Sequence, residues 1–334
     1  MRARLLVEGA GPLATVQDAG RFGHLRYGVT WSGPVEPLGF AAAQAALAAF
    51  GGVTGPALEL SHGGITLRCV EGSVRFALAG GDFAAVLDGV RLGSWTTGVL
   101  TPGARLVVRD GVDGNWATLA FGGAIDCPRW LGSAATLALA GFGGRRLVAG
   151  DVVTVEAAAT GEAGARSFAP PPVETGPIRV VLGPQQAFFA ADSVAALTGE
   201  AFTAAAAFDR MGMVLDGPAL PPLSVTMLST PVIRGGVQVN GAGTATILLA
   251  DHQTTAGYPR IATVISADLG RAAQVRPGQT LRFAVVSAAQ AVAIARQAAA
   301  ARGVWLRGLG GSGSLEERLR GANLIDGVVD AWEG

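Results

Sequence analysis

Short segments in which apolar and polar residues alternate, or in which apolar residues follow one another, run along most of the chain. Glycine and proline separate these segments, as turn residues separate β-strands. A spacing of roughly eight to twelve residues favours a barrel or a sandwich over a parallel α/β sheet. We therefore predict a mainly β protein. Examples of strand segments are 64–70, 73–80, 104–110, 117–123, 151–157, 178–183, 236–241, 244–250, 261–266 and 280–286.

A glycine stands just before three of these predicted strands, in the pairs Pro102-Gly103, Ala149-Gly150 and Pro277-Gly278. A type II turn needs a positive φ at its second central residue, and glycine adopts that conformation without steric cost. The sequence therefore predicts a tight turn of this kind at the start of each strand.

Helices are few in the pattern. Segments rich in alanine and leucine predict helices over 38–52, 186–199 and 287–303. Gly51 and Gly52 are expected to stop the first helix, and Ser287 is expected to cap the start of the third.

A proline-rich segment divides the predicted strands into two groups. Residues 164–177 contain four prolines and no periodicity, as expected of a linker. We predict an N-terminal β domain over 1–163, a linker over 164–177 and a second β domain over 178–286. Residues 287–334 would form a C-terminal helix and tail.

The composition excludes several kinds of chemistry. The chain has 334 residues, of which 25 are basic and 25 acidic, and every basic one is an arginine because no lysine occurs. A P-loop, a pyridoxal enzyme and a biotin carrier all need a lysine, so none of them resides on this polypeptide. The formal net charge is zero and no basic block occurs, so the positive footprint of a nucleic-acid-binding protein is missing.

The cysteines and apolar runs bear on the compartment. Cys69 and Cys127 are too few for a disulfide framework and lie in no Cys/His cluster. We therefore expect both cysteines to be small, buried side chains that pack like apolar residues. The N-terminal segment becomes polar after Gly9 and has no signal-peptide pattern. No apolar run approaches the roughly 18 to 20 residues that span a bilayer. We expect a cytoplasmic protein that contacts no membrane.

The densest group of polar side chains lies at 251–260, between two predicted strands. Loops on a rigid scaffold are where functional sites concentrate. His252 has an ordinary pKa near neutrality and can move a proton. The other polar residues, which can orient an amide, ureido or phosphate group, are Gln253, Thr254, Thr255, Tyr258 and Arg260. The alternative is a polar turn in which Asp251 and the threonines cap their own backbone.

Two further groups of residues are candidate functional sites, although their sequence patterns are weaker. Arg210 lies among apolar residues and glycine, which can hold a guanidinium fork rigidly in a cleft. An ordinary surface pair of Asp209 with Arg210 is an equal alternative. Asp18 and Arg21 lie among glycines near the start of the chain, where turn formation is the favoured interpretation. The three histidines are far apart with no carboxylate at ligand spacing, so no metal site is expected.

Several long motifs resemble those of the KipA-like family, which includes the C-subunit of 5-oxoprolinase (PxpC) and the second half of the carboxyltransferase domain of urea carboxylase. The resemblance runs in order from about Leu5 to Phe283. The motifs that carry it are 15–44 (TVQDAGRFGHLRYGVTWSGPVEPLGFAAAQ), 57–68 (ALELSHGGITLR), 121–136 (FGGAIDCPRWLGSAAT), 209–220 (DRMGMVLDGPAL) and 248–283, which begins LLADHQTTAGYPR. The resemblance implies two cyclophilin-like β-barrel domains with a few short helices.

The resemblance implies three alternative functions. The first is a subunit of an ATP-dependent 5-oxoprolinase, which opens a lactam to glutamate with a KipI/PxpB-like partner and a PxpA-like chain. It is preferred because the chain has the length of a free-standing module. The second is a carboxyltransferase subunit for a urea-like or amide substrate, with biotin supplied by another chain. The third is a regulatory protein that binds a KipI-like partner.

The resemblance also implies roles for particular residues. Arg210 would clamp an oxyanion or a phosphate, and His252 would act beside it as the second catalytic residue. The substrate-binding wall would consist of Gln253, Thr254, Thr255, Tyr258 and Arg260. Relatives often read G-G-Y-P-K here, whereas this chain has Ala256 and Arg260, so a titratable amine is replaced by a permanent charge.

Overall fold

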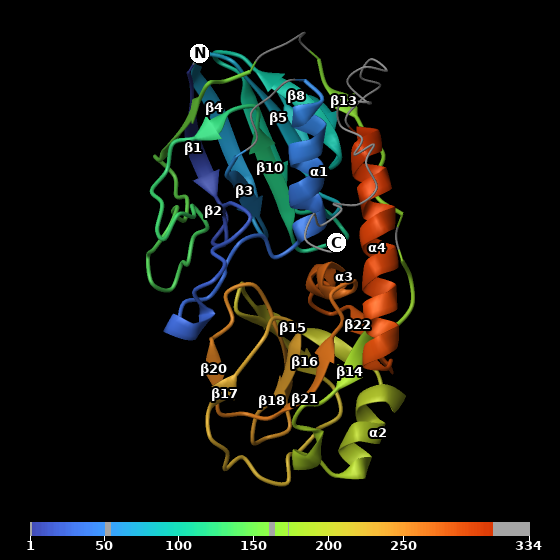
Figure 1. Cartoon of the computed structure of the whole chain (residues 1–334). Coiled ribbons are helices and arrows are strands. Elements are labelled where there is room, and N and C mark those ends of the chain that lie inside the picture. Colours follow the sequence, from blue (N-terminus) through green and yellow to red (C-terminus); the bar gives the residue numbers. More distant parts are fainter. Residues whose placement is uncertain (1, 51–54, 160–163, 173, 310–334) are drawn as a thin grey trace, which may run out of the picture.

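The computed structural model describes the whole chain except residues 1, 51–54, 160–163, 173 and 310–334. Strands dominate both halves of the described chain, and the prediction of a mainly β protein is confirmed. Figure 1 shows one β unit above the other, with the helices α1, α3 and α4 between and beside them.

The first unit contains two sheets. A seven-stranded sheet has the order β11-β12-β1-β4-β9-β6-β7, and a six-stranded sheet has the order β13-β8-β5-β10-β3-β2. The strands of the seven-stranded sheet are Ala124–Ile125 (β11), Val152–Glu156 (β12), Ala3–Ala10 (β1), Ile65–Glu71 (β4), Arg105–Arg109 (β9), Ala84–Leu87 (β6) and Val90–Leu92 (β7). Those of the six-stranded sheet are Arg166–Ser167 (β13), Thr96–Leu100 (β8), Val74–Ala79 (β5), Ala117–Phe121 (β10), Ala57–Leu60 (β3) and Thr15–Gln17 (β2).

The two sheets close around one apolar core. Fully buried side chains from the seven-stranded sheet, such as Leu5 and Leu106, belong to the same cluster as Phe76 and Leu119 from the six-stranded sheet. Burying a side chain of this size contributes about 1.5–3 kcal/mol each. This core, rather than local propensity, holds the many short strands in place.

The second unit is a nearly closed barrel of eight strands in the order β22-β15-β16-β19-β18-β21-β14-β23. Its two edge strands, β22 and β23, are separated only by Arg282, so the sheet curls back on itself. The strands are Thr280–Leu281 (β22), Phe202–Phe208 (β15), Gly212–Asp216 (β16), Ala245–Leu248 (β19), Gly236–Val239 (β18), Arg260–Val264 (β21), Ile178–Leu182 (β14) and Phe283–Val285 (β23). A small pair, Thr230–Pro231 (β17) and Thr255–Ala256 (β20), lies beside it.

Three helices of the described chain lie close to their predicted positions, and α3 was not predicted. The helices are Pro37–Ala48 (α1), Ala191–Gly199 (α2), Leu269–Gln274 (α3) and Ala288–Leu309 (α4), with short 3-10 turns at Leu25–Tyr27 and Gln186–Phe188. Ser287 caps α4 as predicted, because its Oγ accepts from the N–H of Gln290 at 3.2 Å. The predicted stop at Gly51 and Gly52, and the tail after Leu309, lie outside the described residues. None of the helices in the described ranges is long and apolar enough to cross a membrane.

The three predicted turns are present. Gly103, Gly150 and Gly278 have φ values of +90°, +95° and +84°. In each turn the residue after the glycine donates its N–H back to the carbonyl three positions earlier, from Ala104 to Thr101, from Asp151 to Val148 and from Gln279 to Arg276.

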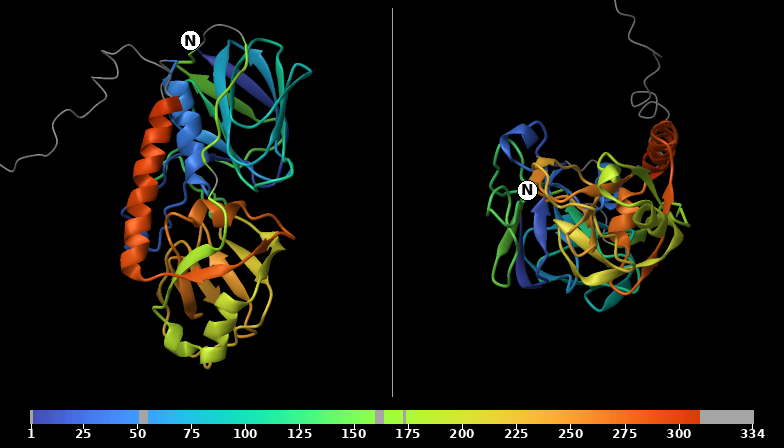
Figure 2. Two further views of the ribbon diagram at one scale, coloured as in Figure 1. Left: turned by 90° about the vertical axis from the view of Figure 1, so that its right-hand side faces the viewer. Right: turned by 90° about the horizontal axis from the view of Figure 1, so that it is seen from below.

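The proline-rich segment is not entirely free of sheet structure. Its residues Arg166–Ser167 form β13, which pairs with β8 of the first unit. The long helix α4 then runs back along the first unit, as Figure 2 shows, and packs against α1. Trp305 of α4 meets Trp95 with ring centroids 6.0 Å apart. The C-terminal helix therefore joins the second barrel to the sheet of the first unit.

Candidate functional site

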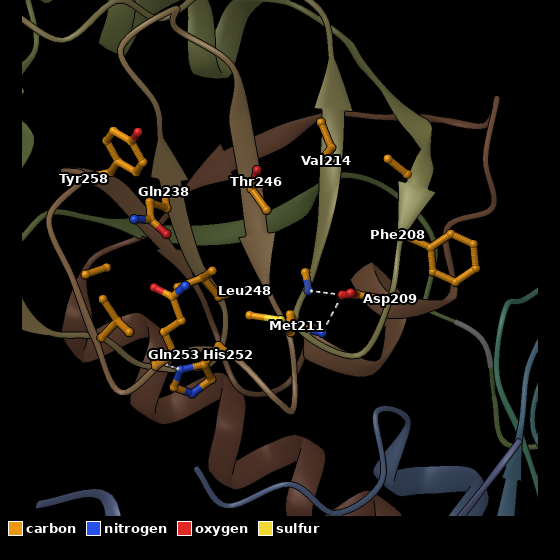
Figure 3. Close-up of a pocket in the computed structure, with 14 residues that line it drawn as sticks. Phe208, Asp209, Met211, Val214, Gln238, Thr246, Leu248, His252, Gln253 and Tyr258 are labelled. Carbon is orange, nitrogen blue, oxygen red and sulfur yellow. Dashed lines mark hydrogen bonds between the residues drawn. The ribbon is translucent and has the colours of Figure 1, made fainter. Parts of the chain in front are cut away.

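A pocket of about 510 Å³ lies on the outer face of the second barrel. Its floor is a row across three paired strands, formed by Val214 of β16, Thr246 of β19 and Gln238 of β18. The neighbouring residues Val237 and Val239 are buried in the barrel core. Because side chains alternate along a strand, Gln238 must point to the opposite face. Figure 3 shows the three side chains of the floor side by side.

The walls come from the loop after β19 and from the hairpin between β15 and β16. The loop supplies His252, Gln253 and Tyr258, and the hairpin supplies Asp209 and Met211. Asp209 shapes the hairpin, since its Oδ1 accepts from the N–H groups of Met211 at 2.7 Å and Gly212 at 3.1 Å. The pocket is therefore formed by a fixed turn facing a polar loop.

His252 lies at the base of the pocket and is 3% exposed. Its Nδ1 is 2.5 Å from the carbonyl oxygen of Gln253. A carbonyl only accepts, so in the neutral ring Nδ1 carries the proton and Nε2 has a free lone pair. Burial lowers the pKa of His252, and the hydrogen bond to Gln253 only partly opposes it. The ring is neutral at pH 7 and can take up a proton at Nε2.

The other polar side chains of the pocket have hydrogen-bonding capacity left over. Within the described chain, the side-chain polar atoms of Gln238, Thr246, Gln253 and Tyr258 make no hydrogen bond to another protein group. Two carboxamides and two hydroxyls therefore converge on one cavity with their donors and acceptors free. This arrangement suits a small ligand with several polar atoms.

Arg210 lies behind the pocket, in the contact between the two units, and does not line it. Its guanidinium donates to Asp251 through Nε (2.8 Å) and Nη2 (3.0 Å), to Glu59 through Nη1, and to the carbonyl of Gly33 (2.7 Å). Burial opposes the charge, but Asp251 and Glu59 outweigh it and raise the pKa of Arg210 above its ordinary value. This arginine is thus a fully charged, fully buried link between the units.

The ion pair also fixes the loop that carries His252. The backbone N–H of Asp251 donates to the carbonyl of Arg210 at 2.7 Å, in addition to the side-chain contacts. Asp251 directly precedes His252. The hairpin, the loop and the first unit are therefore held at one point, next to the histidine at the base of the pocket.

A second arginine supports the same contact. Arg234 donates to the carbonyls of Pro34 (3.1 Å) and Val35, while Glu59 accepts from the N–H of Val35 at 2.6 Å. Burial lowers the pKa of Arg234 to about 10, so it remains charged at pH 7. The segment 33–35 of the first unit is thus held from both sides.

The remaining predicted wall residues lie at the edge of the pocket rather than in its lining. Thr255 belongs to β20, which pairs with β17, and the carbonyl of Thr254 accepts from Val232 at 3.0 Å. Arg260 is buried, and its Nε donates to Oε1 of Gln185 at 3.2 Å. The structure brings His252, Gln253 and Tyr258 together, and leaves Arg210, Thr254, Thr255 and Arg260 outside the lining.

The third group from the sequence has a structural role. Asp18 accepts from Oγ of Ser133 and from the N–H of Ala134, both at 2.6 Å, and Arg21 donates to the carbonyl of Ala135 at 2.5 Å. Gly33 has φ +77°, and a Cβ there would lie 3.0 Å from the carbonyl oxygen of Ala19. This group builds turns and fastens the loop around Ser133, as the favoured interpretation expected.

Gln238 and Thr246 are pocket residues that the sequence analysis missed. Each is the polar position in an alternating strand, so each looks like a solvent-facing residue of a β-sheet. The available signal was their shared outward face on two strands joined by a short turn. Within the residues that the structure covers, no group of three or more His, Cys, Asp or Glu side chains could hold a metal ion.

Comparisons with known proteins place the chain in a family. The family model described as carboxyltransferase domain, subdomain A and B, matches residues 27–285. The 5-oxoprolinase C-subunit of Haemophilus influenzae is 34% identical over 292 residues, which is 85% of this chain and 92% of that protein. The protein of the same name from Escherichia coli is 31% identical over 85% of this chain and 91% of its own. The chain belongs to the carboxyltransferase subdomain A and B family, and the resemblance seen in the motifs is confirmed.

Other similarities cover parts of longer proteins. The urea amidolyase of Lachancea kluyveri is 28% identical over 84% of this chain but only 17% of that protein. The crystal structure of TTHA0988 has a TM-score of 0.73 and 34% identity, covering 84% of this chain and 56% of the other. This chain thus spans about half of that solved relative. The Kluyveromyces lactis urea carboxylase shares the fold, with a TM-score of 0.79 at 24% identity over 92% of this chain and 29% of its own.

Proposed function

We propose that this chain is a subunit of a cytoplasmic, ATP-dependent 5-oxoprolinase that opens the lactam of 5-oxoproline to glutamate. It would act with a KipI/PxpB-like subunit and a PxpA-like subunit. The observation that carries the proposal is the similarity to the 5-oxoprolinase C-subunit along 92% of that protein's length. The pocket adds support, because its free carboxamides and hydroxyls suit a small polar amide.

In this proposal the pocket of the second barrel holds the lactam. Transfer of the terminal phosphoryl group of ATP to the lactam oxygen makes the carbonyl carbon electrophilic for water. The neutral Nε2 of His252 is the group that takes the proton from that water and returns it to the ring nitrogen as the C–N bond breaks. A second water then releases phosphate from the resulting acyl phosphate, so that 5-oxoproline, ATP and two waters give glutamate, ADP and phosphate. Gln253 and Tyr258 orient the ligand from the wall, with Thr254, Thr255 and Arg260 supporting the loop from behind.

Arg210 contributes as a positioning residue rather than as a direct clamp on an oxyanion. Its donors are engaged by Glu59, Asp251 and Gly33, so a ligand would have to displace a buried carboxylate to reach them. Because the chain has no lysine, the phosphates of ATP would be bound by arginines and backbone N–H groups, or by a partner chain.

The test is reconstitution of the assembly. The full chain is purified with its KipI/PxpB-like partner and a PxpA-like chain, and 5-oxoproline-dependent ATP hydrolysis is measured together with glutamate release. Both activities are expected only in the complete mixture. Absence of glutamate from that mixture would overturn the proposal.

A carboxyltransferase subunit is the second candidate, favoured by the similarity to urea amidolyase and by the description of the family. It predicts carboxylation of urea or an amide only when a biotinylated carrier protein is added, since this chain has no lysine to carry biotin. A regulatory role is the third candidate. It predicts tight binding of a KipI-like partner with neither activity.

A further inference from the structure

Gln238 has an unusual combination of position and hydrogen-bonding state. It lies half-buried in the floor of the pocket, between paired strands, with Thr246 directly opposite it on β19. Its carboxamide makes no hydrogen bond to another residue in the part of the chain that the structure describes. A polar side chain on a rigid strand with unsatisfied capacity is well placed to bind a ligand.

The position of Gln238 is fixed by the sheet. Val237 and Val239 point into the barrel core, so a slip of the strand by one residue would expose both of them. Figure 3 shows the carboxamide of Gln238 on the same side of the pocket as that of Gln253, with Thr246 beside it on the next strand. Gln253 is itself exposed, whereas Gln238 is half-buried on a paired strand and can hold a ligand at a defined depth.

The chemistry of a carboxamide selects a particular ligand edge. Its C=O accepts and its NH₂ donates side by side in one plane. A lactam is locked with its N–H and C=O on the same side, so it presents the complementary pair, and an open or cyclic urea does the same. A lactone or a carboxylate lacks the donor. Two parallel hydrogen bonds of this kind are specific in geometry as well as favourable in energy.

The chain already contains a glutamine whose carboxamide pairs with one donor and one acceptor at once. Gln274 accepts from the N–H of Trp116 and donates to the carbonyl of the same residue, both at 2.8 Å. One glutamine side chain thus satisfies a backbone N–H and a backbone C=O of two adjacent peptide groups. Gln238 has the same two groups available and, within the described residues, no protein partner for either of them.

We propose that Gln238 recognises the H–N–C=O edge of a cyclic amide or ureido ligand, and that this contact sets the specificity of the pocket. Thr246 lies next to it and supplies a further hydroxyl to the ligand. The choice of the lactam 5-oxoproline as the ligand rests on the proposed function. The recognition of the edge rests on the pocket alone.

The test compares 5-oxoproline with its lactone counterpart, 5-oxotetrahydrofuran-2-carboxylate, in which a ring oxygen replaces the N–H. Binding is measured calorimetrically on the full chain, alone and with its KipI/PxpB-like partner. The wild-type chain is expected to prefer the lactam by at least about tenfold, because the lactone loses one hydrogen bond and turns a lone pair toward the glutamine oxygen. Equal affinity for the two compounds would overturn the proposal without any variant.

Variants identify the residue that causes the preference for the lactam over the lactone. Gln238→Met keeps the size of the side chain but removes both hydrogen-bonding groups, and the preference is expected to fall within about threefold of unity. Gln253→Met is expected to weaken the binding of both compounds alike and to leave the ratio of their affinities unchanged. Gln297→Met, on the exposed surface of α4, is the matched control and should change neither affinity. An unchanged preference in Gln238→Met would overturn the proposal.

A second ligand pair separates this proposal from the proposed function. It consists of imidazolidin-2-one, a cyclic urea, and its N,N′-dimethyl derivative, which has no N–H. If the chain prefers the cyclic urea through Gln238 but does not bind 5-oxoproline, the lactam substrate is wrong and the role of Gln238 stands. If neither a lactam nor a ureido compound binds, the role of Gln238 is overturned, whatever the assembled enzyme does.

Discussion

Arg210 and Asp251 form a bidentate ion pair, with Nε to Oδ2 at 2.8 Å and Nη2 to Oδ1 at 3.0 Å, and both side chains are at most 5% exposed. Their backbones are also hydrogen-bonded to each other. A bidentate pair fixes orientation as well as distance. The residue that follows Asp251 is His252, so this pair connects the contact between the two units to the histidine at the base of the pocket.

Glu59 completes this ion-pair network, and its removal gives the first prediction. Glu59→Ala leaves the buried charge of Arg210 short of one carboxylate. Breaking a buried pair by removing one partner costs about 3–5 kcal/mol, so the free energy of unfolding should fall by that amount in urea denaturation.

The control for this experiment is another glutamate in a surface pair. Glu71 contacts Arg4 at 3.4 Å, and both side chains are about half exposed. Exposed pairs contribute at most about 1 kcal/mol, so Glu71→Ala should change stability little. If Glu59→Ala were as mild as Glu71→Ala, the network would not hold the units together.

The network illustrates what the sequence could not indicate. The loop 251–260 was found because its polar residues are adjacent in the chain, and His252, Gln253 and Tyr258 do line one pocket. Glu59 and Arg210 are 151 positions apart and belong to different units, so only the tertiary structure brings them together. No local pattern distinguishes a guanidinium that faces a ligand from one that faces a buried carboxylate.

The fold was more predictable than the site, for a physical reason. Turns depend on local rules, and Gly103, Gly150 and Gly278 have the expected positive φ. The capping of α4 by Ser287 could be predicted because that interaction is also local. Gln238 and Thr246 escaped notice because alternation predicts which face a residue occupies, but not whether that face is solvent or the floor of a pocket.

The second prediction concerns His252 and pH. Its pKa is lowered from the ordinary 6.5, chiefly by burial, so the folded protein holds this proton less tightly than the unfolded chain. The stability associated with the neutral ring is present above pH 6.5 and is lost as the pH falls below that value. Turnover of the assembled enzyme should stay constant down to about pH 6.5 on this account and decline only below it.

His252→Gln tests both parts of this prediction. The variant should lower turnover at least about tenfold, which corresponds to a barrier higher by about 1.4 kcal/mol. It should also lose less stability than the wild type between pH 7 and pH 5, measured by urea denaturation at each pH. If the variant had normal turnover, with the same decline at low pH as the wild type, His252 would not transfer the proton and the step would belong to another chain of the assembly.

The third prediction uses the two tyrosines of the chain. Tyr258 lines the pocket and is 49% exposed, whereas Tyr27 is 67% exposed and is not one of the residues that line it. Tyr258→Phe removes one free hydroxyl and should weaken ligand binding by about 2–10-fold, the equivalent of one hydrogen bond. Thermal unfolding should be unaffected, because the hydroxyl contacts no protein group in the described chain.

Tyr27→Phe is the matched control for that change. It removes the same atom from the same type of residue at a position outside the lining of this pocket, so both affinity and stability should equal those of the wild type. Equal ligand affinity in Tyr258→Phe and Tyr27→Phe would exclude the hydroxyl of Tyr258 from the binding site.

The fourth prediction concerns the second connection between the units. Gln274 of α3 accepts from the N–H groups of Asn115 (2.7 Å) and Trp116 (2.8 Å) and donates to the carbonyl of Trp116. Gln274→Leu leaves these buried backbone groups without partners and should lower the free energy of unfolding by at least about 2 kcal/mol. Gln274→Glu keeps the acceptor for both N–H groups but loses the donor, so it should fall between Gln274→Leu and the wild type. Urea denaturation of the three proteins would check this order. Gln297→Met, which changes an exposed glutamine of α4, is the control. If Gln274→Leu were as stable as Gln297→Met, the docking of α3 would not depend on the carboxamide.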